Sequence, residues 1–168
     1  MNVKMYKLIN RLLLFLEKKK KEAEYIRLKN SMKYCGSNVK LESSCHIIVP
    51  QNFEIGDNSS ISSYTVVFAT FGVNIGKNCL ISSNCTISSY NHIQKSDNRV
   101  RDVEEDYKFS KKVKIGDNVW IGMNSCILPG VSIGQNSIVG AGSVVTKNIP
   151  ENEVWVGNPA KCVKKIDI

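Results

Sequence analysis

Aromatic and imidazole side chains are scarce in this chain. Of its 168 residues, 8% are aromatic and only His46 and His92 are histidines, whereas 42% are hydrophobic. The core must therefore be built mainly from aliphatic side chains. Proteins that bind single-stranded nucleic acid stack the bases on aromatic side chains. The repeats described below lack such residues, which argues against a nucleic-acid-binding protein despite the formal net charge of +8.

The sequence also lacks the common patterns of metal and nucleophile sites. None of the six cysteines forms a C-x-x-C pair, and two histidines are too few for a multi-histidine zinc site, so we expect no metal. Cys79 and Cys85 stand six residues apart and look like small core residues, in keeping with a reducing cytoplasm. A G-x-S-x-G motif is absent, so a covalent acyl-enzyme mechanism is disfavoured.

No hydrophobic run is long enough to span a bilayer. Residues from about 3 to 32 predict a helix, because no Gly or Pro interrupts them and they carry an apolar stripe that includes Leu8, Leu12 and Leu16. The stripe is interrupted by polar residues and lacks the cleavage site of a signal peptide. Four lysines follow at 18–21. The helix packs on its own domain or on a neighbour; the alternative is peripheral contact with the inner face of a membrane.

A repeat of six residues dominates the C-terminal part of the chain. Aliphatic residues recur at this interval at Ile115, Ile121, Ile127, Ile133, Val139 and Val145. This period fits neither an α-helix nor an alternating strand, and is typical of a parallel β-helix built from hexapeptide rungs. We expect the residue two positions earlier to point inward as well; these residues are Val113, Val119, Ser125, Val131, Ser137 and Ser143.

The same spacing continues upstream in weaker form. Ile55, Ile61 and Val67 are in register, Val73 and Asn74 shift the phase by two, and the period resumes at Ile75. Since three hexads make one triangular coil, residues 55–72, 75–92, 115–132 and 133–150 predict four coils. The polar interruption at 93–114 is expected to protrude as a loop. The predicted organisation is a helical segment (1–34), a β-helix (35–150) and a C-terminal tail (151–168).

Three sequence blocks carry a resemblance to a known family. KIGDNVWIG, GAGSVVTK and GNPAK resemble the hexapeptide-repeat acetyltransferases, in particular maltose and galactoside O-acetyltransferases and those of bacterial surface-polysaccharide gene clusters. The resemblance covers residues 75–168 well, 37–74 loosely and the N-terminal helix not at all. It implies a left-handed parallel β-helix, a homotrimer with acetyl-CoA bound between neighbouring subunits, and direct acetyl transfer with a histidine base beside a protruding loop.

His92 stands where the family has its catalytic histidine, at the start of the interruption. A hydroxyl is a poor nucleophile at neutral pH, and an imidazole that accepts its proton contributes about 10²–10⁴-fold. The alternative is a histidine with only a structural hydrogen bond. Tyr90 and Asn91 flank His92 and are candidates for acceptor contact. The loop carries Asp97, Arg99, Arg101 and the acidic residues Glu104, Glu105 and Asp106. Each of them is a candidate to orient His92 or to touch a sugar.

The resemblance also implies residues that bind acetyl-CoA. Gly122 and Met123 match the backbone beside the thioester, and Ala141 matches the wall of the pantetheine channel. An outward-facing Trp120 must be covered by a neighbouring subunit, a loop or the cofactor. The remaining candidates lie toward the phosphates, with a plain surface role as the alternative for the lysines; they are Thr146, Lys147, Lys161 and Lys164.

The function expected from these observations is acetyl-CoA-dependent O-acetylation of a sugar hydroxyl, in a surface polysaccharide or its precursor, in the cytoplasm. Alternatives within the same fold are N-acetylation of an amino sugar and O-acetylation of a xenobiotic. The alternative outside enzymes is a non-catalytic β-helix that serves as a scaffold.

Overall fold

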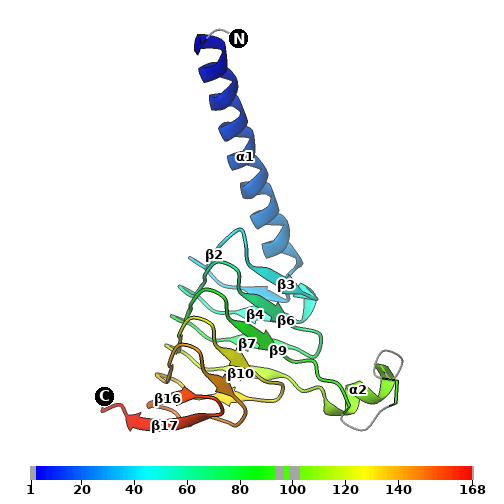
Figure 1. The fold of residues 1–168 in the computed structure, drawn as a ribbon, viewed down its shortest axis with the longest axis vertical. Helices are drawn as coiled ribbons and strands as arrows, with labels where there is room; N and C mark the ends of the chain where they lie inside the picture. The colour runs from blue at the N-terminus through cyan, green and yellow to red at the C-terminus, as the bar shows by residue number, and fades with distance from the viewer. Residues whose placement is uncertain (1–2, 94–96, 99–102, 168) are drawn as a thin grey trace. The chain divides into compact units, whose positions relative to one another are not determined.

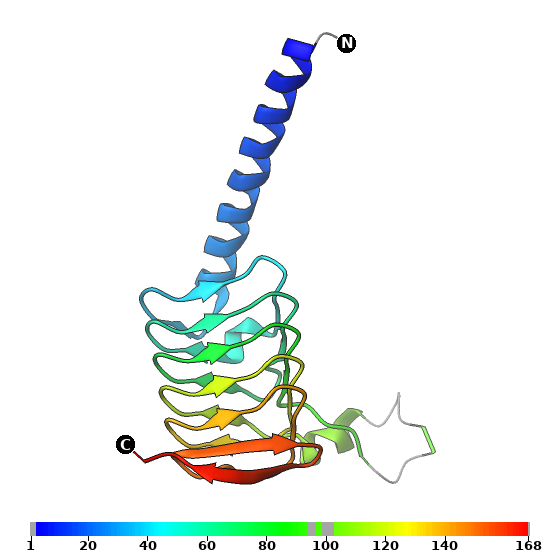
Figure 2. The ribbon, with the colours of Figure 1, turned by 60° about the vertical axis from the view of Figure 1, so that its left-hand side comes forward.

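The computed structural model describes residues 3–93, 97–98 and 103–167, which divide into two compact units at Ser31 and Met32. The first unit is the helix α1 (Val3–Ser31), in which no residue is buried. The second unit is a parallel β-helix (Figures 1 and 2). The fold class predicted from the hexapeptide period is confirmed.

Three sheets form the sides of the β-helix, and successive strands of the chain pass from one sheet to the next. The first sheet contains β1 (Tyr34–Cys35), β4 (Phe53–Ile55), β7 (Val73–Ile75), β10 (Val113–Ile115) and β13 (Ser132–Ile133). The second contains β2 (Lys40–Leu41), β5 (Ser60–Ile61), β8 (Leu80–Ile81), β11 (Trp120–Ile121), β14 (Ile138–Val139), β16 (Glu153–Gly157) and β17 (Ala160–Lys165). The third contains β3 (His46–Ile48), β6 (Val66–Phe68), β9 (Thr86–Ser88), β12 (Cys126–Ile127) and β15 (Val144–Val145).

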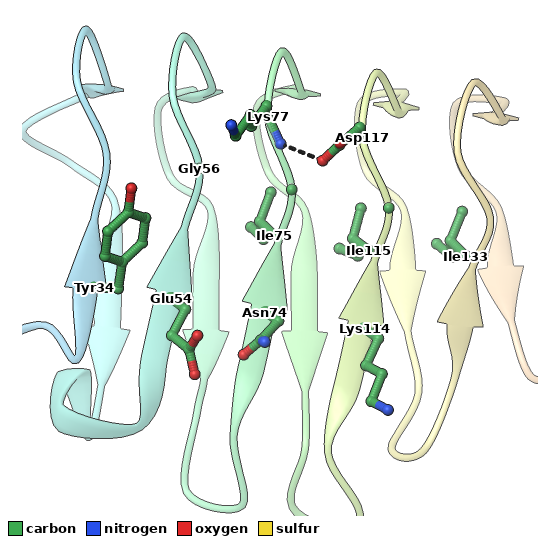
Figure 3. Close-up of a pocket in the computed structure, with 12 residues that line it drawn as sticks. Tyr34, Glu54, Gly56, Asn74, Ile75, Lys77, Lys114, Ile115, Asp117 and Ile133 are labelled. Atoms are coloured by element: carbon green, nitrogen blue, oxygen red, sulfur yellow. Dashed lines mark hydrogen bonds between the residues drawn. The ribbon is translucent and has the colours of Figure 1, made fainter.

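Each strand pairs in parallel with its counterpart one coil further on, so that like side chains stack. In the first sheet Ile55 pairs with Ile75, Ile75 with Ile115 and Ile115 with Ile133, as Figure 3 shows for the last three. The two extra residues of this coil do not lie at Val73 and Asn74 as the sequence phase suggests. Those two residues are part of β7, and the extra length is taken up by the corner before it, where Gly72 (φ 96°) donates to the Ala69 carbonyl.

Aliphatic residues fill the interior as the period predicts. The six residues from Ile115 to Val145 named above are at most 3% exposed, and the residues two positions before them are at most 2% exposed. Burying one Ile or Val side chain contributes about 1.5–3 kcal/mol. Most of the buried serines, and the buried Thr65, donate their hydroxyls to carbonyls of an adjacent coil; for example, Ser59 donates to the Gly76 carbonyl at 2.7 Å.

Asparagines occupy the equivalent turn position in successive coils. Six of them adopt a left-handed backbone, with φ between 54° and 59°, which asparagine tolerates better than most residues: Asn38, Asn58, Asn78, Asn118, Asn136 and Asn152. Their side-chain amides bond from coil to coil, as between Asn118 and Asn136 (3.1 Å) and between Asn136 and Asn152 (2.8 Å). The corner thus repeats both its backbone conformation and its polar contacts.

Two segments depart from the coils. The helix α2 (Val103–Phe109) belongs to the insertion between β9 and β10 and lies out to the side of the coils (Figures 1 and 2). The C-terminal tail forms an antiparallel hairpin of β16 and β17, and β16 continues the second sheet beside β14. A short 3₁₀ helix, η1 (Pro50–Asn52), occupies a corner of the first coil.

Candidate active site

His92 lies four residues after β9, at the edge where the third sheet turns toward the first. We call this edge, formed by residues 89–92, 128–130 and 146–148, the base edge. The His92 side chain is 59% exposed, and its backbone N–H donates to Asn91 Oδ1 at 3.0 Å. The Asn91 N–H in turn donates to Ser110 Oγ at 3.0 Å, so the two ends of the insertion are joined beside the imidazole.

A single buried carboxylate orients the imidazole. Asp106 on α2 is 1% exposed, and its Oδ2 lies 2.7 Å from His92 Nδ1. The Tyr90 hydroxyl donates to the same oxygen at 2.8 Å, and the Ile93 N–H donates to Oδ1 at 2.7 Å. Both carboxylate oxygens are therefore occupied, and the imidazole is held in one orientation.

Packing on the preceding coil holds α2 in place. The Phe71 ring lies 6.2 Å from the Tyr90 ring and 5.1 Å from the Tyr107 ring, measured between centroids. Tyr90 also meets His92 edge to face at 4.9 Å. Ser110, which is buried, donates from Oγ to the Asp106 carbonyl at 2.9 Å and ends the helix. These contacts fix the position from which Asp106 reaches His92.

The hydrogen bonds keep Asp106 ionised. Burial acts to raise its pKa and is the largest single influence, but the hydrogen bonds from Tyr90, from the Ile93 N–H and from His92 together outweigh it, so the pKa lies below its ordinary value. The hydrogen bond to Asp106 raises the pKa of Tyr90, which stays a donor. A carboxylate that accepts at Nδ1 places the proton of a neutral imidazole there. His92 Nε2 is then left as an acceptor able to take a proton.

Of the loop candidates that the structure describes, Asp106 is the one that reaches His92. Asp97 is exposed, and Arg99 and Arg101 lie outside the described residues. Glu104 and Glu105 are exposed, and Glu105 pairs with Lys108 at 2.6 Å. The sequence left these candidates equivalent because it did not reveal the short helix that turns Asp106 inward. The signal in the sequence was the aromatic residue next to Asp106. Tyr107 lies on the same helix as Asp106, and its ring contacts Phe71 of the coils.

Four of the candidate acetyl-CoA residues gather at a different edge. We call the turn from the second sheet to the third, at residues 122–125 and 140–143, the donor edge. Trp120 is 48% exposed just before it, and its Nε1–H donates to Ser82 Oγ at 3.2 Å. Met123, 49% exposed, accepts from the Gly142 N–H at 2.8 Å. A Cβ on Gly122 would come within 2.6 Å of the Ala141 nitrogen, so only glycine allows this approach of the two coils.

The remaining candidates are spread over two other places. Thr146 and Lys147 are exposed after β15, on the base edge, whereas Lys161 and Lys164 are exposed on β17 in the second sheet. The strands of the third sheet, β12 and β15, lie between the donor edge and the base edge. Within one chain, the predicted residues therefore form two groups rather than one pocket.

Two grooves on the β-helix are lined by described residues, and His92 lines neither of them. One, of about 440 Å³, lies on the outer face of the first sheet and is lined by Tyr34, Glu54, Asn74 and Lys114, among others (Figure 3). The other, of about 280 Å³, includes Thr70, Phe71 and Lys112, and so adjoins the aromatic cluster behind His92. Among the described residues, no three His, Cys, Asp or Glu side chains are grouped as metal ligands.

Four of the six cysteines are poorly suited to nucleophilic catalysis. Burial raises the pKa of Cys45 to about 11, and it raises the pKa of Cys79, Cys85 and Cys126 as well. These thiols therefore stay protonated at neutral pH. Cys79 and Cys85 occupy equivalent interior positions and point at carbonyls of the next coil, 3.1 Å from Gly116 O and 3.2 Å from Gly122 O.

Solved structures place the chain in a family. A maltose O-acetyltransferase from Clostridium difficile 630 superposes with a TM-score of 0.74 at 34% identity, over 84% of this chain and 73% of that one. A galactoside acetyltransferase in complex with coenzyme A gives a TM-score of 0.74 at 35% identity, over 83% and 68%. The chain belongs to the hexapeptide-repeat acetyltransferases. This confirms the family to which the motifs pointed.

Sequence comparisons agree with this assignment. The family model for the bacterial transferase hexapeptide (six repeats) matches residues 112–147, and that for the hexapeptide repeat of succinyl-transferase matches residues 53–89. The galactoside O-acetyltransferase of Escherichia coli K12 is 38% identical over 132 residues, which cover 79% of this chain and 63% of that protein. This chain thus spans less than two thirds of the length of that curated relative.

Proposed function

We propose that this chain is an acetyl-CoA-dependent O-acetyltransferase that modifies a sugar hydroxyl, with His92 as the general base. The observation that carries the proposal is the His92–Asp106 pair, which leaves one imidazole nitrogen free to accept a proton at the mouth of the insertion. The resemblance to galactoside and maltose O-acetyltransferases supports both the donor and the class of acceptor.

The chemistry assigned to His92 follows from its contacts. Nε2 takes the proton of the acceptor hydroxyl as its oxygen attacks a thioester carbonyl, and the imidazolium that forms lies 2.7 Å from the ionised Asp106. The tetrahedral adduct would then collapse with cleavage of its C–S bond, and the imidazolium would return the proton to the departing thiolate, which leaves an acetyl ester and free coenzyme A. A carboxylate in this position stabilises the positive charge and keeps the ring in one orientation. Tyr90 and Ile93 hold the carboxylate, so the ring does not have to reorient during the reaction.

The donor edge, together with lysines that lie outside it, suits a long, phosphate-bearing ligand. Gly122 keeps its coil in close contact with Ala141, and a Cβ on Gly142 would meet nothing within 4 Å, so the backbone there is open to solvent. Lysines exposed on β17 and at the base edge offer positive charge to phosphates. Bound acetyl-CoA would supply the activated acetyl group, held by Trp120, Met123 and Ala141, with the lysines toward its nucleotide end.

The separation of the two edges supports a site built between copies of the chain. One copy would contribute the base edge with His92, and a neighbour would contribute the donor edge with Trp120 and Met123. Trp120 and Met123 are each about half exposed, which favours cover by a partner. A closed ring of three copies, each contributing both edges, would form three equivalent sites.

The acceptor is proposed to be a carbohydrate, in a surface polysaccharide or its precursor. Tyr90 and Asn91 lie next to His92, and the Asn91 side chain is exposed beside the imidazole. An exposed amide is a suitable hydrogen-bond partner for sugar hydroxyls. The groove around Thr70 and Lys112 adds further polar groups next to the aromatic cluster.

Thiol release from acetyl-CoA tests the proposal. The purified protein is incubated with acetyl-CoA and separate panels of galactosides, glucosides and amino sugars, and free coenzyme A and acetylated product are measured. The expected result is acceptor-dependent thiol release with an O-acetyl product. Acetylation of amines alone would replace the proposal by an N-acetyltransferase. A protein that neither binds nor consumes acetyl-CoA would favour the scaffold alternative.

A further inference from the structure

The N-terminal part of α1 exposes a broad apolar surface. Ten large apolar residues between positions 3 and 16 are each 43–69% exposed: Val3, Met5, Tyr6, Leu8, Ile9, Leu12, Leu13, Leu14, Phe15 and Leu16. No residue of the helix is buried. Such a concentration of exposed apolar side chains marks a surface that another body covers.

In the N-terminal part of α1, most of the exposed apolar residues and the basic residues lie on opposite sides of the helix. At 3.6 residues per turn, eight of the ten fall on one half of the helix surface, and Val3 and Leu14 are the exceptions. The opposite half carries Lys4, Lys7 and Arg11. We call the eight-residue half, made of Met5, Tyr6, Leu8, Ile9, Leu12, Leu13, Phe15 and Leu16, the apolar face. A wide apolar face opposite basic residues is typical of helices that lie in a membrane interface.

The helix also carries most of the net charge of the chain. Residues 3–31 contain nine basic and three acidic side chains, a net charge of +6 out of the total of +8. Four of the basic residues are the consecutive lysines 18–21, which at 100° per residue point to every side of the helix directly after the apolar face ends. Positive charge adjacent to an apolar face complements a surface of anionic lipids.

A second copy of the helix fits these charges less well. In a parallel bundle of identical helices, lysines 18–21 of every copy would lie at the same level and repel one another. An apolar seam for such a bundle would also have to continue past residue 16, and the lysines interrupt it. Within the described residues, no helix is long and apolar enough to cross a bilayer. A membrane surface with anionic lipids matches both the apolar face and the positive charge of the helix.

We propose that α1 binds peripherally to an anionic membrane surface. The apolar face enters the boundary between headgroups and acyl chains, and lysines 18–21 contact the anionic headgroups. This inference is independent of the proposed acetyl transfer, because it rests only on the helix. Its chemistry requires no particular headgroup beyond a negative charge.

Vesicle binding of the full chain tests the proposal. Co-sedimentation is measured with vesicles of phosphatidylcholine alone and of phosphatidylcholine with 30 mol% phosphatidylglycerol. We expect binding to the anionic vesicles to be at least about tenfold tighter than to the neutral ones, because lysines near an anionic surface are attracted to it. Added salt should weaken this binding. Replacing lysines 18–21 by glutamine should remove that preference.

A matched pair of variants isolates the apolar face. The Leu12→Gln/Leu16→Gln variant alters its centre, whereas Val3→Gln/Leu14→Gln makes similar changes outside it. The first should lose vesicle binding by at least about tenfold while the second keeps it, with helical circular dichroism measured for both. Equal loss in both variants, equal binding to neutral and anionic vesicles, or no vesicle binding at all would overturn the proposal. So would a change of oligomeric mass in the first variant without a loss of vesicle binding, which would point to a second copy instead.

Discussion

The stacked coils and the insertion between β9 and β10 position their side chains by different means. In the coils each residue is placed by its counterparts above and below; Ile121, for example, pairs in register with Ile81 and with Val139. In the insertion, side chains are positioned by one carboxylate instead of by stacking. Asp106 accepts hydrogen bonds from Tyr90 and Ile93 and faces His92.

This difference separates stability from activity. A coil side chain is surrounded by others of its kind, and its loss leaves a cavity in a continuous core. The insertion contributes little to that core, so a change at His92 should leave the coils intact and affect the chemistry alone. The coils thus provide a rigid frame on which a single non-repeating segment carries the proposed base.

Replacing His92 by alanine should produce the largest change in rate. Loss of the base is expected to lower kcat for acetyl transfer by about 10²–10⁴-fold without a shift in the melting temperature. His46→Ala is the matched control, since His46 is also exposed, at the start of β3 in the first coil, and it should keep full activity. Equal rates for wild type and His92→Ala would remove His92 from the mechanism.

Replacing Ile121 by alanine should produce the opposite outcome. Ile121 is fully buried, and an Ile→Ala change in a core costs about 2–5 kcal/mol. Chemical denaturation should therefore show a large loss in the free energy of unfolding, while the folded fraction keeps its kcat. A loss below about 0.5 kcal/mol, the range of surface substitutions, would show that the stacked interior is not the source of stability.

Replacing Asp106 by asparagine should lower kcat by about ten- to a hundredfold, because a hydrogen bond to a charged group contributes about 1.5–3 kcal/mol.

Thermal unfolding across pH checks the ionisation of Asp106. Its pKa is lowered on folding, so its contribution to stability is present above the ordinary carboxyl pKa of about 3.9 and is lost as the pH falls through the lower folded value. The difference in melting temperature between wild type and Asp106→Asn should shrink as the pH falls below the ordinary carboxyl pKa of about 3.9. A difference that stays constant into acid would contradict the proposed network.

Replacing Tyr90 by phenylalanine should have the smallest effect. The ring contact with Phe71 is retained, and only the hydrogen bond to Asp106 Oδ2 is removed. We expect at most about a tenfold loss in kcat, since this hydrogen bond acts through a neighbour of the base. A loss as large as that of His92→Ala would instead indicate that Tyr90 contacts the substrate.

The repeating coils and the helix α1 were predictable from the sequence, whereas the conformation of the insertion was not. A six-residue period identifies Ile121 or Ser137 as interior, because every coil imposes the same environment. The period did not locate the two extra residues, which lie in the corner before Val73. An insertion between two coils shifts the phase of the repeat, but the shift does not show at which position the residues were added. The period also could not distinguish Asp106 from Glu104 and Glu105, because that choice depends on a seven-residue helix and on contacts with Phe71 from another coil.

The separation of base edge and donor edge makes a decisive measurement possible. His92→Ala removes the base from one edge, and Ala141→Trp would block the other at an exposed position. Each variant alone should be inactive. Mixed oligomers are formed by unfolding and refolding an equal mixture of the two variants. If the site is shared between copies, they should recover about a quarter of wild-type activity. In about a quarter of the pairings, an unaltered base edge of one copy meets an unaltered donor edge of its neighbour. Mixed oligomers that are verified by mass and yet remain inactive would contradict the account.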